Sequence, residues 1–167
     1  RAEAQLKERG IAKLSLRALA REIGVSPTPP YRPFADKDAL LAALATEGFV
    51  RFFDAYPNTD DMEPLEGLIA MGRAYLSFAR EHTEIFRLMF GPELLPRRNY
   101  PELFSAGREA FYRVHRLIKV TFAHHELSEE EVASLAHTAW AAVHGVATLM
   151  LDHAESFGYY GDPELQA

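Results

Sequence analysis

The chain contains seven histidines, which could bind a metal or take part in catalysis, and no cysteine. His137 lies seven residues before His144, and His124, His125 and Glu126 are consecutive. Metal sites need several ligands at recurring spacings such as H-E-x-x-H, and no such spacing is present. The G-x-S-x-G, Walker A and G-x-G-x-x-G patterns are also missing. We therefore expect no metal, no cofactor and no catalysis, and keep a helical enzyme or metal protein as a rival interpretation.

Positive charge is concentrated near the beginning of the chain. Residues 1–34 contain seven Lys or Arg and three Glu, a charge of +4, whereas the remaining residues carry -10. A basic end on an acidic body steers that end toward phosphate groups and keeps the rest away from them. The asymmetry indicates a nucleic-acid contact at the N-terminal end, and the alternative is an ordinary fluctuation of charge along the chain.

The stretch from Leu16 to Ser26 has the spacing of a helix-turn-helix. Ala20 is the small residue where two helices cross closely, and Gly24 can adopt the positive φ of the tight turn. Ser26 is suited to cap the next helix, with Pro27 at its first position. Such a unit presents its second helix to the major groove of DNA. Ordinary helical hairpins use the same spacing, so this stretch alone leaves both interpretations open.

The elements around this stretch are expected to be helical throughout. Apolar residues recur at intervals of three and four, and clusters of Pro or Gly separate the segments, which predicts an all-α fold. Asp36 and Ser128 are the expected N-caps of two of the helices, and Ser128 with Glu131 forms a capping box. The expected helices span 1–9, 15–23, 26–33, 36–56, 64–81, 82–90, 101–125 and 128–153.

The chain is expected to divide into two domains, residues 1–48 and residues 49–167. No apolar run approaches the roughly 18 residues of a membrane span, and no signal peptide opens the chain. We expect a cytoplasmic protein without a membrane contact, which the absence of cysteine fits. Both ends are abrupt, because Asp162 and Pro163 read as the start of another helix, so we expect residues to be missing at either end.

The segment from Val25 to Leu41 places Tyr31 and Lys37 at fixed offsets after a short expected helix. This pattern resembles the signature of TetR-family transcription regulators, and the resemblance covers roughly residues 1–48. It implies a three-helix DNA-binding domain followed by a helical regulatory and dimerisation domain. It also implies a homodimer that binds double-stranded operator DNA, most simply as a repressor that a small effector releases.

The resemblance assigns DNA-binding roles by position. Tyr31 and Lys37 would grip phosphates, which positions the domain, whereas base contacts specify the sequence that is read. Arg32 is the residue best suited to guanine, and the methyl group of Thr28 could meet thymine. The residues that the resemblance implies for DNA binding are Ser15, Arg17, Ser26, Thr28, Pro29, Tyr31, Arg32 and Lys37.

Pro29 and Pro33 depart from the family pattern. Each proline removes an N–H group and disfavours helical geometry at the residue before it, and Pro33 falls in the last turn of the expected recognition helix. The alternative function is therefore a helical interaction protein whose DNA-binding head has been degraded by these prolines.

The segments 82–94 and 139–149 resemble the TetR regulators whose C-terminal domain is named for a Trp-His-Gly pattern, here Trp140, His144 and Gly145. Trp140 and His144 are four residues apart and share a helix face. Gly145 would allow a neighbouring helix to approach closely. In this family the C-terminal domain binds a small, often apolar effector between helices and dimerises through its last two helices.

The candidate effector-binding residues are aromatic side chains, histidines and one methionine of the C-terminal region. Aromatic residues at helical spacing more often form a hydrophobic core than a pocket, so core packing is the alternative role for each of them. The candidates are Tyr75, Phe78, Phe86, Met89, Phe90, Phe111, His115, Trp140 and His144.

Overall fold

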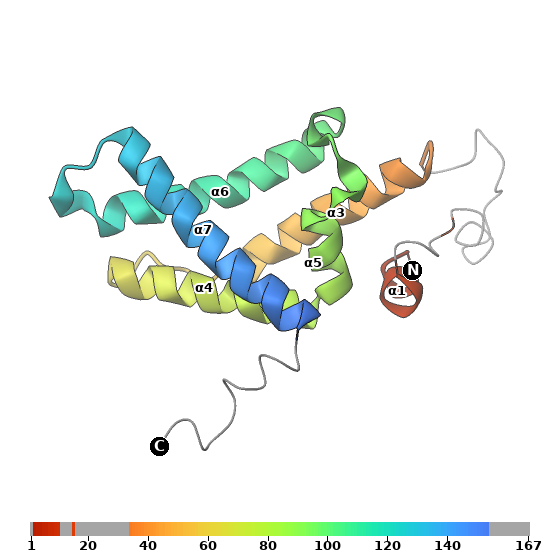
Figure 1. Cartoon of the computed structure of the whole chain (residues 1–167), viewed down its shortest axis with the longest axis horizontal. Helices are drawn as coiled ribbons and strands as arrows, with labels where there is room; N and C mark the ends of the chain where they lie inside the picture. Colours follow the sequence, from red (N-terminus) through yellow and green to blue (C-terminus); the bar gives the residue numbers. More distant parts are fainter. Residues whose placement is uncertain (1, 11–14, 16–33, 154–167) are drawn as a thin grey trace, which may run out of the picture. The chain divides into compact units, whose positions relative to one another are not determined.

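The computed structural model describes residues 2–10, 15 and 34–153, and these residues form helices and turns with no strand among them. Short 3-10 turns at Pro92–Leu94, Arg97–Asn99 and Ala123–His125 lie between the later helices. The predicted all-α fold class is confirmed. The helices are α1 (Ala2–Arg9), α3 (Lys37–Asp54), α4 (Pro64–Glu81), α5 (Thr83–Phe90), α6 (Pro101–Thr121) and α7 (Glu129–Asp152) (Figure 1).

Two of these helices begin at the caps that the sequence predicted. Asp36 accepts a hydrogen bond at 2.7 Å from the backbone N–H of Ala39 in the first turn of α3. At α7, the backbone N–H of Glu131 donates to the Ser128 hydroxyl, and the backbone N–H of Ser128 donates to the Glu131 carboxylate at 2.9 Å. Each cap satisfies N–H groups that the first turn of a helix leaves without a partner, and this sets the first residue of the helix.

The helix predicted over 101–125 is shorter than expected. α6 ends at Thr121, whose hydroxyl donates to the carbonyl of Leu117 at 2.8 Å. Phe122 to His125 then form a tight turn, and Glu126 adopts a left-handed φ of 48°. The left-handed Glu126 ends this turn and lets the chain reverse. Hydrophobic periodicity does not report a change from an α-helix to a 3-10 turn, so the pattern placed the end of this helix too late.

The chain folds as two compact units that are interleaved in the sequence. The first unit contains Arg1–Phe53 and Glu84–Arg108, and the second contains Asp54–Thr83 and Glu109–Ala167. These units are defined by packing, whereas the expected division at residue 48 concerns function and stays a prediction.

The first unit has an apolar interface between α3 and α5. Phe49 and Leu88 are almost completely buried, and the ring of Phe49 meets the edge of Phe90 with 5.5 Å between centroids. A Cβ atom at Gly48 would lie 2.6 Å from Ile85 Cγ2 and 2.8 Å from Met89 Sδ. Because real Cβ atoms do not approach other atoms so closely, a side chain at position 48 would force Ile85 and Met89 to move or the two helices to separate.

The second unit is built around the packing of α7 on α4 and α6. In Figure 1, α7 crosses α4, and these helices are in close contact. A second apolar cluster joins α6 to the first half of α7 through the buried residues Ile118, Val132 and Ala136. Partly buried side chains of all three helices, including Leu68 and Phe111, pack against this cluster. The unit therefore holds α4, α7 and the part of α6 from Glu109 onward together, and it contains the hydrogen bond between the buried Tyr75 and His144.

Candidate functional site

Of the eight residues predicted to bind DNA, the structure describes Ser15 and Lys37. Ser15 is half-buried and lies outside any described helix. The other six lie outside the described residues: Arg17, Ser26, Thr28, Pro29, Tyr31 and Arg32. The roles of all eight residues stay predictions.

Lys37 is the first residue of α3 and is half-buried. It directly follows the capping residue Asp36, and the exposed Asp38 is the acidic residue of the first turn. The N-terminal end of a helix carries a partial positive charge and presents backbone N–H groups, which favours phosphate binding. A lysine ammonium group at this position adds a full positive charge to the same end of the helix.

The nine predicted effector residues separate into the two units. Phe86, Met89 and Phe90 belong to the first unit, where Phe86 and Met89 are buried and the rings of Phe86 and Phe90 are 4.9 Å apart. Their contacts are those of a packed core. The remaining six belong to the second unit: Tyr75, Phe78, Phe111, His115, Trp140 and His144.

Three of the six meet in a polar cluster between α4 and α7. Tyr75 is buried, with 3% of its surface exposed, and its hydroxyl lies 2.7 Å from His144 Nδ1. Trp140, one turn before His144, also hydrogen-bonds Tyr75, and the rings of Trp140 and His144 are 5.7 Å apart at 37°. We name Trp140, Tyr75 and His144 the relay, because each is joined to the next by a hydrogen bond.

The relay determines where the hydrogen atoms lie. An indole N–H can only donate, so the oxygen of Tyr75 accepts from Trp140. The buried hydroxyl of Tyr75 needs an acceptor for its own hydrogen, and His144 Nδ1 is within reach at 2.7 Å. Burial lowers the pKa of His144, which favours the neutral ring. A neutral ring that accepts at Nδ1 carries its hydrogen at Nε2.

Two residues that the sequence did not single out interact electrostatically in this unit. Tyr56 lies in the connection between α3 and α4, and burial raises its pKa, with Tyr75 contributing to the same shift. The positive charge of Arg113 on α6 acts on the pKa of Tyr56 in the opposite direction. Because the two residues come from separate segments, a periodicity argument could not place them together. In the sequence, Tyr56 stands out only as the aromatic residue nearest to the acidic pair Asp60 and Asp61.

The other predicted residues of the second unit make different contacts. Phe111 packs against the apolar cluster of α6 and α7, and its ring lies 4.3 Å from that of His137. His115 lies next to Phe111 with 6.4 Å between the ring centroids. Phe78 is buried and stacks with the ring of His82 at 4.7 Å. The structure therefore brings Tyr75, Trp140 and His144 together and leaves these residues in separate packing contacts.

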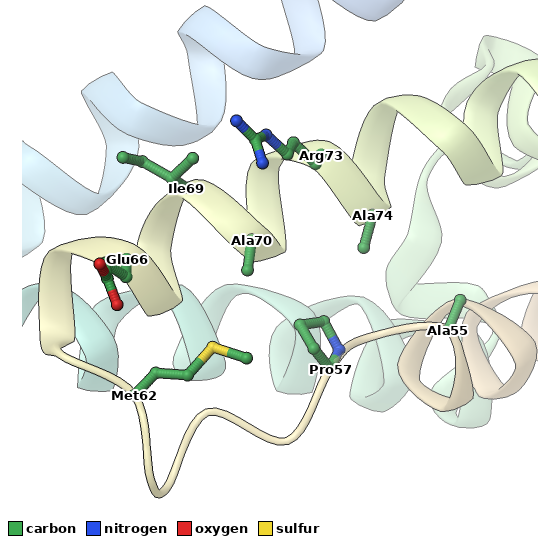
Figure 2. A pocket seen from close by; sticks show the side chains of 8 residues that line it. All are labelled: Ala55, Pro57, Met62, Glu66, Ile69, Ala70, Arg73 and Ala74. Atoms are coloured by element: carbon green, nitrogen blue, oxygen red, sulfur yellow. The ribbon is translucent and has the colours of Figure 1, made fainter.

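A groove with a volume of about 660 Å³ lies outside this cluster, and none of the nine predicted residues lines it. Figure 2 shows it between α4 and the connection that precedes it, with Met62 and Pro57 on one side and Ala70 on the helix. The remaining lining residues are Ala55, Glu66, Ile69, Arg73 and Ala74. Its size falls within the range of about 300–1,000 Å³ that small-molecule sites occupy. Ala55 and Pro57 flank Tyr56 in the sequence, and Ala74 precedes Tyr75, so the same segments form the groove and the cluster.

Gly145 of α7 has open space beside it. A Cβ atom at this position would meet no atom within 4 Å, so no helix among the described residues approaches it closely. The expectation that a neighbouring helix packs closely against Gly145 stays a prediction, and it now concerns a second molecule.

The described part of the chain offers neither a metal-binding cluster nor a membrane-spanning helix. Within residues 2–10, 15 and 34–153, no group of three His, Asp or Glu side chains could hold a metal ion. No helix of these residues is both long and apolar enough to cross a membrane.

Known proteins resemble both ends of the chain. Residues 1–44 match the family model described as "Bacterial regulatory proteins, tetR family", and residues 68–165 match "Tetracyclin repressor-like, C-terminal domain". A solved structure of a protein with unknown function from Rhodococcus sp. RHA1 is 32% identical, with a TM-score of 0.77 over 98% of this chain and 83% of that one. The crystal structure of "putative regulatory protein SCO4313" is 20% identical, with a TM-score of 0.69 over 91% and 80% of the two chains. No curated protein matches the chain.

Proposed function

The chain belongs to the TetR family of bacterial regulatory proteins, and from this premise we propose that it is a homodimeric transcription repressor released from operator DNA by a small effector. The proposal divides the chain into a DNA-binding domain, residues 1–48, and a ligand-binding and dimerisation domain, residues 49–167. Its place of action is the cytoplasm, where bacterial operator DNA is found.

The observation that carries the DNA-binding proposal is the match of residues 1–44 to the regulatory family model together with the position of Lys37. Lys37 begins α3, where the charge of the lysine and the helix dipole act in the same direction. The charge of +4 over residues 1–34 supports the same contact. Ser15, Arg17, Ser26, Thr28, Pro29, Tyr31 and Arg32 complete the proposed DNA-binding set.

The dimer proposal rests on the exposed face of α7. The segment from Val132 to Leu151 contains no Asp, Glu, Lys or Arg, and Val146 and Leu149 are 40% and 46% exposed. Ala142 and Gly145 are small residues on the same face, which would let a partner helix approach closely. Charged residues are depleted at the centre of protein interfaces, and an uncharged exposed stripe fits that composition. We propose that α6 and α7 form the interface between two copies.

A charge on this face tests the dimer. Val146→Glu is expected to convert the dimer into a monomer, because it would bury an unpaired carboxylate in the interface. Val50→Glu is the matched control, since Val50 is an equally exposed valine, 47% exposed, on α3. Light scattering of the two variants distinguishes the outcomes, and a dimeric Val146→Glu protein would place the interface elsewhere.

The effector site is proposed at the relay of Trp140, Tyr75 and His144. It combines buried apolar surface with a few convergent polar groups, as small-molecule sites do. α4, which carries Tyr75, is followed after His82 by α5, and α5 packs on α3 through Gly48. An effector that prefers one arrangement of α4 would therefore bias the position of α3 and Lys37.

Binding to the DNA upstream of the protein's own gene, measured across a salt series, tests the function. Specific binding should weaken steeply as salt increases, and Lys37→Ala should reduce the slope of log K against log salt by about 1. Arg80→Ala is the control, because Arg80 is an exposed cation on α4 in the other unit.

The absence of specific binding at low salt would contradict the regulator proposal and favour the degraded-head alternative. That alternative makes its own prediction, since replacing Pro29 by Ala and Pro33 by His should then restore binding. Restored binding would identify the prolines as the cause.

A further inference from the structure

The groove between α4 and the connection that precedes it is a cavity that the proposed function leaves unused. It lies within the second unit, and its lining does not include any residue of the relay (Figure 2). Its volume of about 660 Å³ is in the range of small-molecule sites. A molecule bound in this groove would therefore occupy a site of its own.

The shape of the groove is fixed by contacts within the connection. Asn58 Oδ1 accepts a hydrogen bond at 3.0 Å from the backbone N–H of Asp60. The backbone N–H of Met62 donates to the carbonyl of Thr59 at 3.1 Å. Thr59 also packs against α4 at Gly67, where an added Cβ atom would lie 3.2 Å from Thr59 Cβ. These contacts hold both the turn and its spacing from the helix, so the groove is preformed.

The lining of the groove is mainly apolar. Ala70 and Ala74 face it from α4, and Met62 and Pro57 lie on the opposite side (Figure 2). Met62 is 39% exposed, and a methionine sulfur makes favourable contacts with aromatic rings. An apolar body fits this lining better than a chain of amide groups, because buried amides without hydrogen-bond partners cost free energy.

Two opposite charges complete the lining. Glu66 and Arg73 are its charged residues, and both are exposed. They are seven residues apart, so they lie on nearly the same face of α4 and about 10 Å apart along the helix axis. Among residues 2–10, 15 and 34–153, no side chain forms an ion pair with either of them. Both charges are therefore available to a ligand.

We propose that the groove binds a rod-like apolar ligand with an ammonium group at one end, held by Glu66, and a carboxylate at the other, held by Arg73. The body of the ligand packs between Met62 and Ala70. Each charged end makes charge-assisted hydrogen bonds, which are stronger than neutral ones. A rigid body loses little conformational freedom when it binds. This inference goes beyond the proposed function, because the site is separate from the relay and is tested without DNA.

Nuclear magnetic resonance of the full chain, with carbon-13 in the methionine methyl groups, tests the site. Met62 lines the groove, whereas Met71 and Met89 are buried and do not line it. The probe is 4'-(aminomethyl)biphenyl-4-carboxylate, whose rings should shift the methyl signal of Met62 and leave the signals of Met71 and Met89 in place. A Met62 signal that does not move would overturn the proposal.

Two further probes test the need for both charges. They are 4'-methylbiphenyl-4-carboxylate, which lacks the ammonium group, and (4'-methylbiphenyl-4-yl)methylammonium, which lacks the carboxylate. Each is expected to bind about threefold more weakly than the dipolar probe, because exposed charge pairs make modest contributions. A singly charged probe that binds as tightly as the dipolar one would overturn the pairing of the two charges.

Two variants locate the ligand. Ala70→Leu should reduce the affinity for the dipolar probe at least about tenfold, because the larger side chain fills the groove. Ala43→Leu is the matched control, since Ala43 is an exposed alanine on α3. Unchanged affinity in Ala70→Leu would place the ligand outside the groove.

Arg73→Gln should lower the affinity for the dipolar probe and for the carboxylate about threefold, and leave that for the ammonium probe nearly unchanged. Arg80→Gln is the matched control, an exposed arginine further along the same helix. Because Arg73 is exposed, this substitution tests the site even where Ala70→Leu disturbs folding. Equal losses for Arg73→Gln and Arg80→Gln would refute the contact with the carboxylate.

Discussion

The two compact units differ in one of the contacts that join their helices. In the first unit, α3 and α5 interlock through apolar contacts so close that any side chain at position 48 would force Ile85 and Met89 to move. In the second unit, α4 and α7 meet at a buried phenol that is hydrogen-bonded to an indole and an imidazole. Apolar interlocking depends on shape, and its loss is costly because interiors are close-packed. A polar relay depends on its partners, so it can respond to a ligand or to protonation. The comparison predicts a rigid connection in one unit and an adjustable one in the other.

The largest effect is expected from the apolar interface. Phe49→Ala should lower the free energy of unfolding by about 3–5 kcal/mol, because it removes a buried ring and leaves a cavity. Denaturant unfolding measures this loss. Phe104→Ala is the control, since Phe104 is 45% exposed in the same unit. Similar losses for the two variants would contradict the assignment of Phe49 to the centre of this core.

A smaller loss is expected at Gly48. Gly48→Ala should cost about 1–3 kcal/mol, because the new methyl group must displace Ile85 or separate α3 from α5. Gly72→Ala has open space around it and should be neutral or stabilise α4 by up to about 1 kcal/mol. Thermal unfolding of the Gly48→Ala and Gly72→Ala variants measures the two changes in stability. If both substitutions stabilise the protein, the interface is more adaptable than the comparison requires.

Removing one hydroxyl from the relay should cause an intermediate loss of stability and a change in tryptophan fluorescence. Tyr75→Phe removes the hydroxyl that joins Trp140 to His144, and the groups left behind should cost about 1–3 kcal/mol. Trp140 is the only tryptophan of the chain, so fluorescence reports on the relay directly. Tyr112→Phe is the control, because Tyr112 is half-exposed on α6. Unchanged fluorescence in Tyr75→Phe would mean that the indole does not sense this hydroxyl.

The smallest effect is a dependence of stability on pH. Burial lowers the pKa of His144 below its ordinary value of 6.5, so the unfolded chain takes up the proton first as the pH falls. Stability should therefore decrease as the pH drops below about 6.5, while the neutral ring is fully stabilised above that pH. His144→Gln should flatten this part of the curve relative to the unsubstituted protein. The measurement is unfolding by urea at several pH values, and identical slopes would exclude His144 as the source.

Much of the local structure could be predicted because its causes lie within a few residues. Asp36 and Ser128 cap the helices expected of them, since a side chain that bonds the third residue of a helix needs no distant partner. Trp140 and His144 lie together on one face, as a separation of four residues requires. The end of α6 was misplaced because the tight turn from Phe122 to His125, which follows Thr121, leaves no periodic signal.

The sequence by itself determined the helical periodicity, the capped helix starts and the family, since these depend on short-range spacing and on matched motifs. Only the tertiary structure decided that Tyr75, 69 residues before His144, supplies the bond that orients its ring. It also decided that Tyr56 and Arg113 interact electrostatically, and that Phe86 and Met89 belong to the buried core of the other unit, where Phe90 is half-buried. The physical reason is that periodicity reports which face of a helix is buried, whereas the partner of that face is set by how distant segments pack.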